Sequence, residues 1–126
     1  MLSSAPLLID QKQLATLAGE VGPALPAIME TFRGEVRDRI IAMRRLLQEG
    51  ARQGLSAEAH SIKGTASAIG LSRLSHDAKV LEHGAGTMSG EEMAAQIRAI
   101  QRSFYESCSA LMELGHLPSL AGDGAR

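Results

Sequence analysis

Residues 59–70 hold a histidine, a lysine and a glycine at spacings that suit phosphoryl chemistry. On a helix, His60, Lys63, Gly64 and Ser67 share one face, because the last three follow the histidine by three, four and seven positions. The opposite face is an apolar stripe of Leu55, Ala59, Ile62, Ala66 and Ile69. We therefore expect His60 to point into solvent, with an ammonium group one turn away.

This arrangement is suited to carrying a phosphoryl group. An exposed imidazole is in large part neutral near pH 7, and its free ring nitrogen is a nucleophile. Lys63 would offset the charge of the phosphorylated ring, and Ser67 would donate a hydrogen bond to it directly or through water. A side chain at position 64 would normally cover the imidazole, and glycine removes that cover at a helix cost of about 1 kcal/mol relative to alanine.

Each of these residues also has a plainer interpretation. A single exposed histidine is usually only a surface residue, and a single lysine is usually a solvated helix position. A glycine can serve close helix packing, but Gly64 lies on the face away from the apolar stripe. The combination of the three is what favours a functional site.

Composition predicts one helical domain. The chain has 126 residues, 44% of them hydrophobic, with three aromatic side chains. The core must therefore be aliphatic, and richness in Leu, Ala, Met, Glu and Arg favours helix over sheet. A net charge of −1 and so few aromatics give no general attraction to nucleic acid. No leader pattern or 18-residue apolar run is present, so we expect a cytoplasmic protein with no membrane segment.

The apolar spacing predicts five helices. Asp10 caps the first and Gly50 ends the second, Ser72 is a candidate cap for the fourth, and Ser89 with Glu92 forms a capping box. Short connections make the long helices antiparallel neighbours. The expected fold is an all-α, antiparallel four-helix bundle with a short additional N-terminal helix, in a domain of residues 8–115 with flexible termini at 1–7 and 116–126. The helices are expected at about 11–21, 24–49, 52–69, 73–85 and 90–114.

Other polar residues receive structural interpretations. His76 and His83 are seven positions apart, about 10.5 Å along a helix, too far to share one tetrahedral zinc ion, so we predict no metal site. Cys108 is interpreted as a buried small hydrophobe rather than a redox thiol. The arginines of the second helix are interpreted mainly as its solvated face, with a contact to an acidic partner as the alternative; they are Arg33, Arg37, Arg44 and Arg45.

The segment Ala59-His60-Ser61-Ile62-Lys63-Gly64 resembles a histidine-containing phosphotransfer (HPt) domain of two-component phosphorelays. The resemblance extends over about residues 8–114. Its other matching positions are Leu8-Ile9-Asp10, Leu14, Leu17, Ile28, Met29, Phe32, Gly70, Leu74, Leu81 and Glu82. One departure is Asp77-Ala78, where a cysteine is frequent in the family, and this should affect packing rather than chemistry.

The resemblance implies that His60 is phosphorylated, that Lys63 assists and that Gly64 leaves room for a partner. The partner would be a response-regulator receiver domain, which supplies the phosphoryl-bearing aspartate and its Mg²⁺, so the chain needs no cofactor of its own. Leu14 and Leu17 are interpreted mainly as core residues, and the resemblance implies a further binding role for them, because in this family the first helix adds apolar receiver contacts. The expected function is a relay that accepts a phosphoryl group from one receiver and passes it to another.

Several alternatives remain open at this stage. No phosphate-cradling glycine loop is present, and Ser61 stands where the dimerisation domains of sensor kinases usually carry an acidic residue, so we expect no ATP-dependent kinase activity. The chain could also be the phosphorylated domain of a chemotaxis-type or hybrid kinase, a non-catalytic receiver-binding module, or a purely structural bundle. A hybrid sensor kinase is a possible further partner. We expect a monomer, and Met1 with short flanks favours a stand-alone protein.

Overall fold

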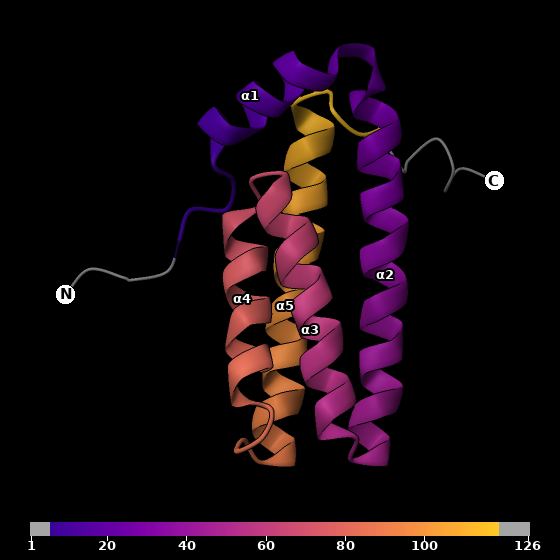
Figure 1. The fold of residues 1–126 in the computed structure, drawn as a ribbon, viewed down its shortest axis with the longest axis vertical. Coiled ribbons are helices and arrows are strands. Elements are labelled where there is room, and N and C mark those ends of the chain that lie inside the picture. The colour runs from indigo at the N-terminus through magenta and orange to yellow at the C-terminus, as the bar shows by residue number, and fades with distance from the viewer. Residues whose placement is uncertain (1–5, 119–126) are drawn as a thin grey trace.

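A computed structural model describes residues 6–118, and within that range four helices form an antiparallel bundle (Figure 1). The four are α2 (Leu25–Glu49), α3 (Arg52–Ala68), α4 (Ser72–Gly84) and α5 (Gly90–Glu113). The shorter α1 (Gln11–Val21) lies across one end of the bundle, and a 3-10 turn (Gly22–Ala24) joins it to α2. The predicted fold is confirmed.

The helices form a closed ring in which each contacts the next along the chain and α2 also contacts α5. The most extensive contact is between α3 and α4. Small side chains at this contact, Ala59 and Ala66 on α3 with Ala78 on α4, are fully buried and allow the two helices to approach closely. Side chains on the outer faces of α3 and α4 are thereby brought within reach of each other.

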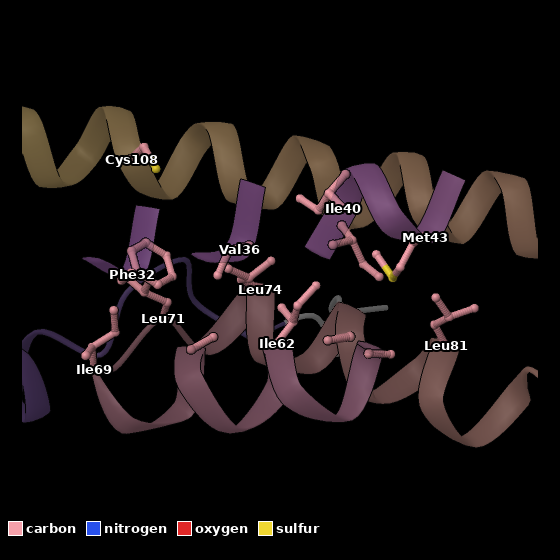
Figure 2. Packing of buried hydrophobic residues seen from close by; sticks show 14 of the residues in the cluster. Phe32, Val36, Ile40, Met43, Ile62, Ile69, Leu71, Leu74, Leu81 and Cys108 are labelled. Carbon is pink, nitrogen blue, oxygen red and sulfur yellow. The ribbon is translucent and has the colours of Figure 1, made fainter. Parts of the chain in front are cut away.

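The apolar stripes of the helices meet in one aliphatic core, part of which Figure 2 shows. Two aromatic rings contribute, since Phe32 and Phe104 lie edge to face with centroids 5.8 Å apart. Cys108 is 6% exposed, and burial raises the pKa of its thiol to about 11, so it is almost wholly protonated at neutral pH. The interpretation of Cys108 as a buried small hydrophobe agrees with this environment.

Most of the predicted helix ends are confirmed. The Asp10 carboxylate accepts from the Gln13 N–H at 3.1 Å, and Ser89 and Glu92 form the capping box. Gly50 ends α2 with a left-handed φ of 68°. The prediction that Ser72 caps α4 is wrong, because Leu71 occupies the N-cap without a side-chain hydrogen bond and Ser72 is the first helical residue.

The folded region reaches beyond residue 115. Residues 1–5 and 119–126, most of the expected flexible termini, lie outside the described residues, but Leu117 is 4% exposed and belongs to the core. The carbonyl of Pro118 accepts a hydrogen bond from Arg33 at 3.3 Å, and Arg33 also pairs with Glu30 at 2.6 Å. The expectation that Arg33 is solvated is therefore wrong: its side chain is 12% exposed because the C-terminal segment covers it.

No helix within residues 6–118 is both long and apolar enough to cross a membrane.

Candidate functional site

His60 lies near the middle of α3 on the outer face of the bundle, with its side chain 66% exposed. The helix phase causes this orientation: Leu55, Ala59 and Ile62 are fully buried, so the intervening position 60 turns away from the core. The outward orientation predicted for His60 is confirmed.

Glu82 on α4 contacts both polar residues of the candidate site. Its Oε2 lies 2.8 Å from Nδ1 of His60, and its Oε1 lies 2.8 Å from Nζ of Lys63. The side chain is only 18% exposed, and Oε1 is shielded from solvent. Hydrogen bonds from Lys63 and from His60 lower the pKa of the Glu82 carboxyl below its ordinary value. The group is therefore a carboxylate at neutral pH.

This contact determines which nitrogen of His60 is available for chemistry. A carboxylate has only acceptor atoms, so the ring nitrogen that contacts it must carry the hydrogen. Nδ1 of His60 is therefore the donor to Glu82, and Nε2 is the nitrogen with a free lone pair in the neutral ring. The site thus consists of an exposed ring with a fixed tautomer and an ammonium group that shares its carboxylate.

Two serine hydroxyls tie the site residues to the neighbouring helix. Ser56 on α3 donates to the carbonyl of Glu82 at 2.9 Å, and Ser75 on α4 donates to the carbonyl of Lys63 at 3.2 Å. These hydrogen bonds cross the α3–α4 contact in opposite directions. They fix the register of the two helices at the level of the site.

Lys63 is less exposed than the sequence indicated. Its side chain is 28% exposed, because it leans against α4 to reach Glu82. The expectation of a fully solvated Lys63 side chain is therefore wrong. Its ammonium group is held beside the imidazole by a carboxylate that both side chains share.

Gly64 has open space where a side chain would be. A Cβ added there would meet no atom within 4 Å. Gly70 differs, since its φ is 83° and a Cβ would lie 3.0 Å from the Asp10 carbonyl oxygen. The fold therefore requires glycine at position 70 and does not require it at position 64, which leaves the surface beside His60 uncovered.

The remaining predicted site residues lie toward α1. Ser67 is exposed on the same face of α3, and its carbonyl accepts from Nε2 of Gln13 at 2.6 Å. Leu14 is 3% exposed and packs in the core, which agrees with its core interpretation and leaves little of its surface for a receiver. Leu17 is half-buried against the core, with part of its surface open, and its receiver contact stays a prediction.

Sequence reasoning assigned no role to Glu82 and did not single out Gln13. In the sequence, Glu82 stands out only as a position that matches the HPt resemblance, beside the apolar residue Leu81. The missing information was the register of α3 against α4, which places Glu82 opposite His60 although 22 positions separate them. An acidic residue flanking the apolar stripe of the next helix was the one available signal.

Comparisons with known proteins agree with this geometry. Residues 27–116 match the Hpt domain family. Among curated proteins, none matches the sequence significantly. The fold is similar to the crystal structure of histidine-containing phosphotransfer protein B (HptB) from Pseudomonas aeruginosa PAO1, with a TM-score of 0.79 and 30% sequence identity over 87% of this chain and 95% of that one.

Proposed function

The chain belongs to the Hpt domain family, and on this premise we propose that His60 is the residue that carries the phosphoryl group. Its role is histidine phosphotransfer in two-component signalling. The observation that carries the assignment to His60 is the 2.8 Å contact between its Nδ1 and Glu82, which leaves Nε2 free on an exposed ring. The test is transfer of labelled phosphate from a phosphorylated receiver domain, compared between wild type and His60→Gln.

In the proposed reaction, Nε2 of His60 attacks the phosphorus of an aspartyl phosphate on a receiver domain. The N–P bond forms as the P–O bond to the aspartate breaks, and the aspartate leaves as a carboxylate. The ring keeps its Nδ1 hydrogen and becomes positively charged, and the Glu82 carboxylate stabilises that charge. Lys63, 2.8 Å from the same carboxylate, is close enough to turn toward the phosphoryl oxygens.

The second half of the proposed relay is the reverse of the first. A second receiver aspartate attacks the phosphorus, and neutral His60 leaves with its Nδ1 hydrogen still donated to Glu82. The Mg²⁺ that this chemistry uses comes with the receiver in our proposal, while the chain supplies the nucleophile and its position. We assign no ATP-dependent kinase activity to the chain.

We further propose that residues 8–118 form one domain, which acts as a monomer in the cytoplasm. This domain is three positions longer than the 8–115 that the sequence indicated, because Leu117 packs into the core. Two narrower roles stay as alternatives: the phosphorylated domain of a chemotaxis-type or hybrid kinase, and a module that binds receivers without carrying phosphate. Uptake of labelled phosphate from an isolated receiver would favour the relay over a module that only binds receivers.

Replacing Lys63 by alanine is expected to slow phosphoryl transfer about tenfold, which corresponds to about 1.4 kcal/mol of lost transition-state stabilisation. The loss follows from removing the cation that, in our proposal, turns from Glu82 toward the phosphoryl oxygens. Transfer rates of label from a phosphorylated receiver measure the effect. The matched control is Lys79→Ala, an exposed lysine on α4 without an ion pair to Glu82, and equal rates in the two variants would contradict the role of Lys63.

Replacing Gly64 by leucine is expected to weaken receiver binding at least tenfold while the helix content stays the same or rises. The Cβ of a residue at position 64 meets no atom within 4 Å, and the rest of the leucine side chain would lie over the imidazole. Titration calorimetry with a receiver and circular dichroism measure the two effects. Gly90→Leu, at an open position on α5, is the control and should bind as wild type does; unchanged affinity in Gly64→Leu would refute the role of Gly64 in access.

A further inference from the structure

A second face of the bundle, formed by α2 and α5, exposes large apolar side chains. Ile41 on α2 is 60% exposed and Tyr105 on α5 is 72% exposed. Between them lies a groove of about 320 Å³, to which the partly buried Phe104 also contributes. Both exposed side chains flank the apolar stripe of their helix rather than standing alone on the polar side. Contiguous exposed apolar surface of this kind is typical of a binding face.

The groove is also positively charged. Three arginines line it, namely Arg33, Arg37 and Arg44, and no carboxylate does. Arg33 is neutralised by Glu30, whereas the nearest carboxylate to Arg37 is that of Asp38 at 3.6 Å, with both side chains well exposed. Such an exposed pair is worth little. Arg44 forms no ion pair with any residue in the range 6–118.

This face is separate from the site at His60. The helices contact each other in the cyclic order α2, α3, α4, α5, so the α2–α5 edge lies opposite the α3–α4 edge that holds His60 and Glu82. Figure 1 shows α2 and α4 on opposite sides of the bundle. A partner bound in the groove would leave the imidazole open.

We propose that the groove between α2 and α5 binds an acidic amphipathic helix of a partner protein. The apolar side of that helix packs between Ile41 and Tyr105, and its carboxylates pair with Arg37 and Arg44. The groove extends from Arg33 to Arg44, eleven positions or about 16 Å along α2, which matches about three turns of a bound helix.

Charge also argues against a second copy of the chain as the occupant. In a symmetric dimer through this face, the same patch occurs on both subunits, so Arg37 and Arg44 would face a groove lined by arginines and no carboxylate. Charges of one sign brought together across an interface oppose binding. An acidic partner instead supplies the charge that the lining lacks.

The proposal is tested with a synthetic 18-residue peptide that has leucine on one helical face and glutamate on the other, titrated into the ¹⁵N-labelled chain. Shift changes are expected at the amides of α2 and α5 around Ile41 and Tyr105, and a peptide with lysine in place of glutamate should bind at least tenfold more weakly. Arg44→Glu should weaken binding of the acidic peptide at least fivefold. The neighbouring Arg45→Glu makes the same charge change outside the groove lining and should stay within twofold of wild type.

Three results would overturn the proposal: shift changes away from α2 and α5, equal binding of the two peptides, or equal effects of Arg44→Glu and Arg45→Glu. Concentration-dependent dimerisation in sedimentation that Tyr105→Ala abolishes would also overturn it, in favour of a second copy. Arg44→Glu should leave phosphoryl uptake unchanged, because the groove is distant from His60, so a failure of peptide binding says nothing against the proposed role of His60.

Discussion

A His60→Gln variant is expected to take up no measurable phosphate, at least about a thousandfold less than wild type, while its bundle stays folded. Glutamine keeps a polar side chain that can reach Glu82 but has no ring nitrogen to attack phosphorus. The fold tolerates the replacement because the His60 side chain is 66% exposed and makes its one polar contact with Glu82. We expect a change in unfolding free energy within about 1 kcal/mol. Labelled transfer from a receiver and urea unfolding measure the two effects.

His76→Gln is the matched control for this variant. His76 is an exposed histidine on α4 and has no contact with Glu82, so its replacement should leave phosphate uptake at the wild-type level. Uptake in His60→Gln equal to that in His76→Gln would mean that the phosphoryl group goes elsewhere.

A Glu82→Gln variant is expected to transfer phosphate about ten to a hundred times more slowly, because the charge-assisted contact with the imidazole ring is lost. The amide keeps the size of the carboxylate but carries no charge to stabilise the imidazolium that forms on attack. It can also donate to Nδ1, so the tautomer with a free Nε2 is no longer enforced. Rates with a saturating receiver separate this effect from weaker docking.

Glu58→Gln provides the control for Glu82→Gln. Glu58 lies on the same helix as His60 and is a partly buried carboxylate, but its partner is Arg39 at 3.0 Å. Its replacement removes an ion pair of similar burial without touching the site. Equal transfer rates in the two variants would show that Glu82 acts only through the stability of the bundle.

The free energy of unfolding of wild type and that of Glu82→Gln should also depend differently on pH. The folded state lowers the pKa of Glu82, so the stabilisation from its ionised form is present at neutral pH and lost as the pH falls through the lowered value. The stability advantage of wild type over Glu82→Gln should therefore shrink between pH 7 and pH 3. Urea unfolding at both values measures it, and an advantage that grew on acidification would contradict the assigned direction.

The elements of the fold were predictable because their signals are local. Apolar spacing sets the helix phase, and Asp10, Gly50 and the Ser89–Glu92 box mark helix ends by hydrogen bonds within a few positions. Ser72 failed as a cap because the short α3–α4 turn is set by the buried Leu71, whose N–H bonds the Ala66 carbonyl at 2.9 Å. That contact depends on packing and leaves no local signature.

Only the part of the site that lies on one helix was predictable, because only that part is set by local spacing. His60, Lys63 and Gly64 lie within one helical turn and a half, so their shared face follows from sequence spacing alone. Glu82 is brought to them by the register of α4 on α3. Helical periodicity does not give that register, because it shows which face of a helix is apolar but not which side chains of the next helix lie against it.

The most direct test of the central claim is to locate the phosphoryl group on the protein after transfer from a receiver. Proton–phosphorus correlation spectra of the ¹⁵N-labelled chain, combined with mass spectrometry under alkaline conditions, identify both the residue and the ring nitrogen. The structure predicts a single phosphoramidate on Nε2 of His60, because Nδ1 is held by Glu82. Phosphate on Nδ1, or on any other residue, would contradict the account.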